Sequence, residues 1–197
     1  KVEINGTNLK NDITTQLLIK KKRITAKIIN KESIIFCGGI LIKNFYKEKF
    51  PEIIVKVNQK DGEEIKKNSV LITLIGNANL ILTTERTILN FLQHLCSIST
   101  ETRNYVSQIK KYKTKLLDTR KTTTGLRKLE KYATQTGGAV NHRLGLYDDI
   151  LIKDNHIKAL GGVDEMIEVL KKKKIKNYKV ECDNIFQVKK CIRAGAK

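Results

Sequence analysis

The stretch KLLDTRKTTTGLRKLEKYA (115–133) shows the pattern that repeats through the second half of this chain. A short apolar run ends in charged residues, and a helical pattern follows it. Three strand candidates are each followed by such a pattern: KLLD (115–118) by one near 126–136, ILIK (150–153) by one near 163–173, and YKVEC (178–182) by one near 185–194. Strict alternation of strand and helix predicts an α/β fold with a parallel sheet or barrel.

The first half of the chain has a different pattern, in which short β-type runs follow one another. These runs are ITAKII (24–29), SIIFCGGILI (33–42), EIIVKV (52–57), SVLITLIG (69–76) and LILTT (80–84). From Glu85 to Ile109 apolar residues are spaced by threes and fours, which predicts a long helix. The change of pattern predicts two domains, residues 1–95 and residues 96–197.

The composition excludes several classes of protein. The chain has 197 residues, of which 40% are hydrophobic and 30% charged, as in a soluble globular protein and unlike a disordered one. The longest apolar run, 33–42, is too short and too broken by glycine to span a membrane. The four cysteines lack metal-type spacing, so we expect reduced thiols in a cytoplasmic protein.

The net charge of +19, from 39 basic and 20 acidic residues, is typical of a polyanion binder. Most of the surplus is lysine, in a chain also rich in isoleucine and asparagine, as an AT-rich genome would encode. The runs KKKR (20–23) and KKKK (171–174) have no interleaved aromatic residues. We therefore favour solvated lysine faces over a nucleic-acid surface, and keep a basic nucleic-acid-binding protein as the alternative.

Polar and charged residues follow each strand candidate of the second half. Because the carboxyl ends of parallel strands meet on one face, these side chains are expected to form one site. They are Asp118, Arg120 and Lys121; Lys153, Asp154, Asn155 and His156; Glu181 and Asp183; and the connecting Asn141, His142 and Arg143. Arginine and lysine suit carboxylates and phosphates. The acids among them indicate a metal-bound polyol or pyrophosphate.

The block DTRKTTTGLRKLEKYATQTGGAVNHRLGLYDDILIKDNHI (118–157) closely resembles the central block of the quinolinate phosphoribosyltransferase family, also called nicotinate-nucleotide pyrophosphorylase (carboxylating). Further matches are NDITTQLLI (11–19), ERTILNFLQHLCSIST (85–100) and VECDN (180–184). The resemblance implies an N-terminal α/β sandwich domain followed by a TIM-like α/β barrel that is incomplete here.

The same resemblance implies an activity. Such an enzyme is a pentosyltransferase of NAD biosynthesis that uses magnesium. It transfers the phosphoribosyl group of phosphoribosyl pyrophosphate to quinolinate, releases pyrophosphate and carbon dioxide, and leaves nicotinate mononucleotide. Glycosyl transfer passes through an oxocarbenium-like state, so positioning and electrostatics supply most of the catalysis.

Family roles fall on matching positions of this chain. By resemblance, Arg120, His142, Arg143 and Lys153 line the quinolinate and phosphoribosyl sites, and Lys121 occupies a neighbouring basic position. Glu181 faces the ribose hydroxyls and is the candidate magnesium ligand. Lys121, Lys153 and Glu181 are the candidate catalytic residues. Arg86 is expected to reach the active site of a partner subunit in a homodimer or larger assembly.

The sequence leaves several interpretations open. Asp118 either contacts the ligand or organises the turn around Arg120, and His156 either joins the site or is a loop histidine. His94 lies within the long helix, and we expect it to contribute to packing and not to the chemistry. Family members continue beyond the position of Lys197, so the chain is expected to be part of a longer product or a truncated, inactive copy. A related pyrophosphorylase-like protein acting on another acid is the remaining alternative.

Overall fold

The computed structural model describes residues 12–19 and 22–197 in two compact units, one ending at Asn141 and one running from His142 to Lys197. Three sequence features lie partly outside the described residues. They are the start of the domain expected at 1–95, Asn11 of the NDITTQLLI segment, and Lys20 and Lys21 of the KKKR run.

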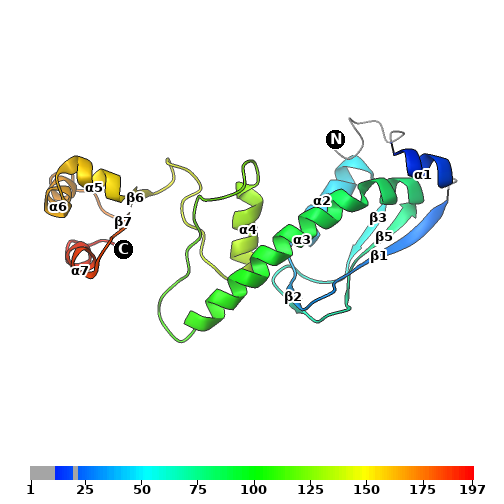
Figure 1. The fold of residues 1–197 in the computed structure, drawn as a ribbon, viewed down its shortest axis with the longest axis horizontal. Coiled ribbons are helices and arrows are strands. Elements are labelled where there is room, and N and C mark those ends of the chain that lie inside the picture. Colours follow the sequence, from blue (N-terminus) through cyan, green and yellow to red (C-terminus); the bar gives the residue numbers. More distant parts are fainter. Residues whose placement is uncertain (1–11, 20–21) are drawn as a thin grey trace. The chain divides into compact units, whose positions relative to one another are not determined.

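The first unit is built around a three-stranded antiparallel sheet in the order β1-β5-β3 (Figure 1). Its strands are β1 (Arg23–Ile29), β5 (Val70–Asn77) and β3 (Ile54–Val57), with Ala26 opposite Leu74 and Leu74 opposite Val55. A short antiparallel pair, β2 (Ile34–Ile35) and β4 (Glu64–Ile65), forms a second sheet. The strands predicted at 24–29, 52–57 and 69–76 are therefore confirmed.

The helices of this unit are α1 (Ile13–Leu18), α2 (Gly39–Lys49), α3 (Ala78–Ile109) and α4 (Arg127–Gly137). Helix α2 packs against β3, and α3 packs along β1 and β5. The shared core includes Phe36, Tyr46, Ile72, Ile88 and Leu95, all nearly or fully buried. Burial of these large apolar side chains supplies the main driving force for folding of this unit.

Two strand predictions in the first half are wrong. Within 33–42 only β2 is a strand, and α2 begins at Gly39 because Gly38 adopts a left-handed conformation (φ +110°) and Asp61 accepts hydrogen bonds from the Gly38 and Gly39 N–H groups. The run 80–84 lies inside α3, which begins after Asn77, whose side chain accepts a bond from the Asn79 N–H. Hydrogen bonds to the first N–H groups thus accompany a helix at 39–49 where a strand was predicted, and a long helix that begins at Ala78 instead of Glu85.

The second unit alternates strand and helix. Its elements are β6 (Ile150–Ile152), α5 (Asp154–Leu160), α6 (Val163–Lys172), β7 (Tyr178–Val180) and α7 (Ile185–Arg193), and β6 pairs in parallel with β7. Met166, Leu170, Tyr178 and Cys191 form its core. The parallel pairing and the helices near 163–173 and 185–194 are confirmed, whereas α5 was not expected.

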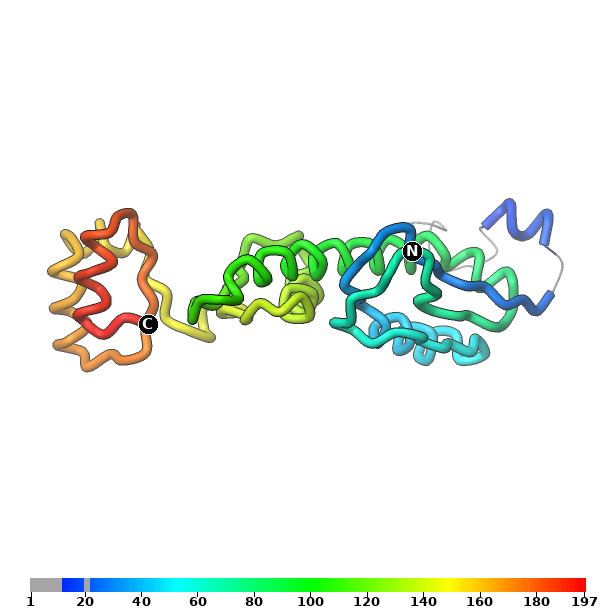
Figure 2. The backbone as a smooth tube through the Cα atoms, turned by 90° about the horizontal axis from the view of Figure 1, so that it is seen from below, coloured from blue at the N-terminus to red at the C-terminus, as the bar shows by residue number. Residues whose placement is uncertain are grey.

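The strand expected at 115–118 is reduced to one parallel bridge between Leu117 and Val140. Helix α4 follows as predicted and lies beside α3 (Figure 2). The close approach requires glycine at 137, because a Cβ there would lie 2.5 Å from the carbonyl oxygen of Ser99. Helix α3 continues unbroken through residues 95 and 96, and the domain division there stays a prediction. Within the described ranges, none of the helices has the length and apolar character needed to cross a membrane.

Candidate active site

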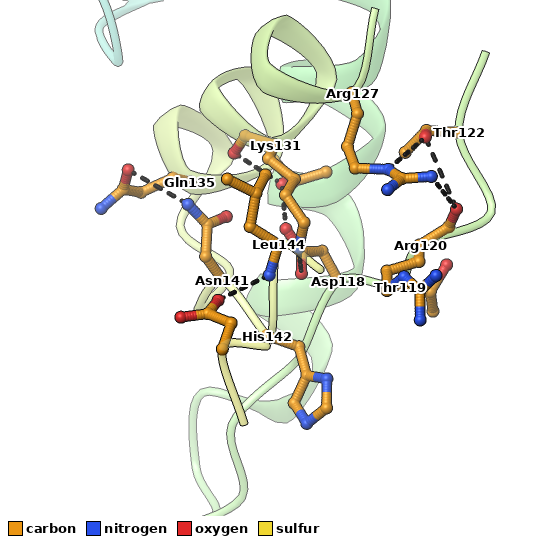
Figure 3. Close-up of polar contacts among 12 residues, drawn as sticks. Asp118, Thr119, Arg120, Thr122, Arg127, Lys131, Gln135, Asn141, His142 and Leu144 are labelled. Carbon is orange, nitrogen blue, oxygen red and sulfur yellow. Dashed lines mark hydrogen bonds and ion pairs between the residues drawn. The ribbon is translucent and has the colours of Figure 1, made fainter. Parts of the chain in front are cut away.

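The loop that follows Asp118 carries Arg120 and Lys121, and its beginning is fixed by a buried ion pair. Lys131 Nζ of α4 lies 2.5 Å from Asp118 Oδ1, and the hydroxyl of Thr134 donates to Asp118 Oδ2 at 3.3 Å (Figure 3). The Lys131 and Asp118 side chains are only 5% and 4% exposed. Asp118 thus organises the loop from within the protein, one of the two roles that the sequence left open for it.

Two further α4 residues hold the middle and the end of this loop. Arg127 Nε donates to Thr122 Oγ1 at 3.1 Å, and its Nη2 to the Arg120 carbonyl at 3.5 Å (Figure 3). Glu130 accepts the Thr123 N–H at 3.1 Å and lies 2.9 Å from His94 Nε2. Burial alone would raise the pKa of Glu130, but the bonds from Thr123 and His94 outweigh it and lower that pKa.

The predicted cations of this loop differ in their surroundings. Arg120 is half-buried, and its Nε is enclosed with no hydrogen-bond partner among the residues that the structure describes. Lys121 is exposed, and its N–H donates to Thr119 Oγ1 at 3.1 Å. A buried guanidinium N–H without an acceptor carries a free-energy cost, which an anionic ligand would relieve.

Arg86 lies elsewhere in the first unit, on the exposed side of α3. It lines a groove of ≈ 600 Å³ whose other walls include Leu89, Gln93 and Ser97 of α3 and the Asn30–Ile34 connection. Arg120 and Lys121 are not among the residues that line this groove.

In the second unit, Lys153 and Glu181 lie together at the carboxyl ends of β6 and β7. Ile152 pairs with Val180 in the parallel register, so the next residue of each strand emerges at the same edge. Lys153 Nζ is 3.3 Å from Glu181 Oε2, with side chains 44% and 56% exposed. The sequence-based expectation that strand ends converge therefore holds for this pair.

His142 and Arg143 precede this pair in the chain. His142 Nε2 lies 4.0 Å from Asp149 Oδ2, and Lys179 also donates to Asp149. The pKa of Asp149 is lowered, first by the Lys179 bond, then by the Ile150 N–H and by the charges of Lys179 and His142. Arg143 is 8% exposed, and its Nε has no hydrogen-bond partner in the described part of the chain.

Sequence reasoning missed three contacts around these residues. His156 Nδ1 accepts the Lys153 N–H at 2.9 Å and so caps α5, which gives the histidine a structural role. The other two contacts are Lys131 with Asp118 and His94 with Glu130. Lys153 and His156 are three residues apart in the sequence, and Asp118 and Lys131 are thirteen apart. His94 and Glu130 are thirty-six residues apart, and the packing of α3 on α4 brings them together.

The chemistry of Glu181 fits one ligand of a magnesium ion. Magnesium is held by one or two carboxylates together with water and substrate phosphate oxygens, and the Glu181 carboxylate is half exposed at a strand end. The described ranges 12–19 and 22–197 contain no cluster of three or more His, Cys, Asp or Glu side chains arranged to hold a metal. Glu181 is thus a residue that could contribute one ligand to such an ion.

Comparison with known proteins shows two family domains that together match most of the chain. The quinolinate phosphoribosyl transferase N-terminal domain matches residues 12–96 and the corresponding C-terminal domain matches residues 98–197. A probable nicotinate-nucleotide pyrophosphorylase (carboxylating) of Bacillus subtilis is 40% identical over 190 residues, which cover 94% of this chain and 65% of that protein. A counterpart from Synechocystis is 40% identical over 162 residues, covering 82% of this chain and 55% of the relative.

Solved structures agree with the fold. The nicotinate-nucleotide pyrophosphorylase of Francisella tularensis is 39% identical with a TM-score of 0.85, covering 95% of this chain and 67% of that one. The enzyme of Ehrlichia chaffeensis is 35% identical with a TM-score of 0.86, covering 95% and 69%. The fold is thus an N-terminal α/β domain followed by part of a TIM-like α/β domain. The chain spans less than two thirds of the length of the curated relatives named here. Because the two family domains match residues 12–96 and 98–197, the chain belongs to the quinolinate phosphoribosyl transferase family.

Proposed function

We propose that the protein containing this chain transfers the phosphoribosyl group of phosphoribosyl pyrophosphate to quinolinate with decarboxylation, giving nicotinate mononucleotide, pyrophosphate and carbon dioxide for NAD biosynthesis. The names of its relatives support this reaction. The observation that carries it is the Lys153–Glu181 pair, a cation and an acid at adjacent parallel strand ends.

The arginines are assigned to the substrate's negative charge. Arg120 and Arg143 each keep a buried Nε without an acceptor among the described residues, and a carboxylate or phosphate oxygen would satisfy such a donor. Quinolinate has two carboxylates, so it calls for more than one cation. In the second unit, His142 lies near Asp149 and is assigned to substrate binding. Cations around the ring would also stabilise the negative charge left when carbon dioxide departs.

The second substrate is assigned to Lys121, Lys153 and Glu181. The Glu181 carboxylate would accept hydrogen bonds from the ribose hydroxyls and contribute one ligand to magnesium. Magnesium, when bound, neutralises charge on the departing pyrophosphate. Lys121 and Lys153 are each assigned to phosphate oxygens of this substrate, where positive charge would stabilise the transition state more than the ground state.

The assembly and the location are part of the proposal. Arg86 is exposed on α3 and lines a groove that Arg120 does not line, which supports a role toward the active site of a second copy. We therefore propose a homodimer or larger assembly. All four cysteines are free thiols, which supports a reducing compartment such as the cytoplasm.

The test is turnover with defined substrates. Purified protein should release pyrophosphate and carbon dioxide from quinolinate and phosphoribosyl pyrophosphate only when magnesium is present. Nicotinate in place of quinolinate serves as the matched comparison. Turnover of nicotinate without turnover of quinolinate would replace this proposal with a related enzyme that acts on another acid.

A further inference from the structure

Glu130 connects three separate parts of the first unit. It lies in the first turn of α4 and is only 9% exposed. One carboxylate oxygen accepts the Thr123 N–H, and the other lies 2.9 Å from His94 Nε2 of α3. One oxygen therefore contacts the loop and the other contacts α3, a helix from a different segment of the chain.

The connection has a mechanical consequence for the loop. Helix α3 is anchored in the core through Ile88, Leu92 and Leu95, which are almost fully buried next to His94. The His94 contact and the Thr123 bond share one carboxylate. Glu130 therefore holds the end of the loop at a fixed position relative to α3. A buried carboxylate is stable only with such partners, so the arrangement is held by both of them.

The neighbouring residue of α4 holds the other end of the loop. Lys131 contacts Asp118, at the start of the segment, and Glu130 contacts Thr123, at its end. Arg120 and Lys121 lie between these two fixed points. Fixing a loop before a ligand arrives removes conformational entropy that binding would otherwise have to overcome.

We propose that Glu130 is a positioning residue for Arg120 and Lys121, with His94 as its support on α3. Glu130 does not itself touch the substrate. The inference rests on the proposed function for its kinetic consequence, whereas its structural part depends only on the contacts described above.

The structural part is tested by amide hydrogen exchange on the protein that contains this chain. In the Glu130→Ala variant the Thr123 amide should exchange at least about tenfold faster, because its acceptor is gone. His94→Asn should give a smaller acceleration, since Glu130 keeps its bond to Thr123. Glu168→Ala, at an exposed position on α6, is the control and should leave exchange at Thr123 unchanged.

The kinetic part is tested with the same variants. Glu130→Ala should raise KM for quinolinate about tenfold with a smaller change in kcat, and Glu130→Gln, which keeps one acceptor oxygen, should recover part of the loss. If the alanine variant does not fold, Glu130→Gln and His94→Asn serve for both measurements. Unchanged exchange at Thr123 in the variants that fold would overturn the positioning role.

The two proposals fail in different ways. If Glu130→Ala accelerates exchange at Thr123 but leaves KM unaltered, the Glu130–Thr123 contact is purely structural. That result would overturn the role of Glu130 in positioning Arg120 and Lys121. Wild-type protein that does not turn over quinolinate would instead contradict the proposed function, while the exchange result would still decide whether Glu130 holds the loop.

Discussion

Lys131 Nζ lies 2.5 Å from Asp118 Oδ1, and the two side chains are almost completely enclosed. Thr134 supports the same carboxylate with a hydrogen bond at 3.3 Å. The pair joins α4 to the start of the loop that carries Arg120 and Lys121. A buried ion pair of this kind contributes little net stability compared with an apolar pair, but the loss of one partner leaves an uncompensated charge.

Lys131→Met should therefore lower the free energy of unfolding by about 3–5 kcal/mol. Urea unfolding followed by circular dichroism measures the change. Lys128→Met is the matched control, since Lys128 is exposed on the same helix, and it should change stability by less than about 0.5 kcal/mol. Adding Asp118→Asn to Lys131→Met should restore part of the loss, and no recovery in the double variant would contradict the ion-pair argument.

Arg120→Ala tests carboxylate recognition. The variant should fold normally and lose at least about 3 kcal/mol of transition-state stabilisation, seen as a drop in kcat/KM for quinolinate. Arg193→Ala, at an exposed position at the end of α7, is the control and should retain full activity. Unchanged kcat/KM in Arg120→Ala would remove this arginine from the site.

Mixed assemblies test the role of Arg86. If Arg86 serves the active site of a neighbouring copy, subunits with Arg86→Ala and subunits with Lys153→Ala should complement each other, because some sites in mixed dimers receive both wild-type residues. Each variant alone should be nearly inactive. Absence of recovery in verified mixed dimers would show that Arg86 acts within its own chain or not at all.

Much of the second unit could be predicted from its sequence. Short apolar runs followed by helical patterns located β6, β7, α6 and α7, because period and length together separate strands from helices. The parallel register then placed Lys153 beside Glu181. Local pattern and topology were sufficient for this pair.

Other parts could not be predicted from local pattern. The apolar residues Ile40, Leu41 and Ile42 of α2 predict a strand from local pattern. The helix instead begins where Asp61, about twenty residues further along the chain, accepts hydrogen bonds from the Gly38 and Gly39 N–H groups. The engagement of Glu130 by His94 depends on the packing of α3 against α4. Contacts between segments distant in sequence set both features, and periodicity does not record them.

Glu181→Ala tests the assignment of the ribose and magnesium site. Both side chains of the Lys153–Glu181 pair are about half exposed, so the melting temperature should change by little, in keeping with the small contribution of exposed ion pairs. Activity should fall sharply, and the magnesium concentration needed for half-maximal rate should rise. Glu168→Ala, at an exposed acidic position on α6, is the control and should leave activity and its magnesium dependence unchanged. Equal magnesium dependence in wild type and Glu181→Ala would contradict the assignment.

The pH dependence of stability tests the environment of Glu130. Its pKa in the folded state is below the ordinary 4.5: burial raises it, but the bonds from Thr123 and His94 prevail. A depressed carboxyl pKa stabilises the fold fully above the unfolded-state pKa, and this contribution is lost as pH falls toward the folded-state pKa. The difference in unfolding free energy between wild type and Glu130→Gln should therefore be nearly constant between about pH 5.5 and 6 and shrink steadily below about pH 4.5.

The comparison of wild type with Glu130→Gln isolates this one carboxylate. Asp149 and Asp154 also have lowered pKa values, the first chiefly through Lys179 and the second chiefly through the Asn155 N–H, so both proteins lose stability in acid. Those contributions cancel in the difference, and Glu168→Gln controls for the loss of a negative charge. His94 faces Glu130, so the same pair of proteins is compared again with Asn at position 94. There the Thr123 bonds are the remaining cause that lowers the pKa of Glu130, so the acid-side loss should be smaller than with His94 in place. A difference that grows as the pH falls would mean that the pKa of Glu130 is raised in the folded protein and that its bonds do not outweigh its burial.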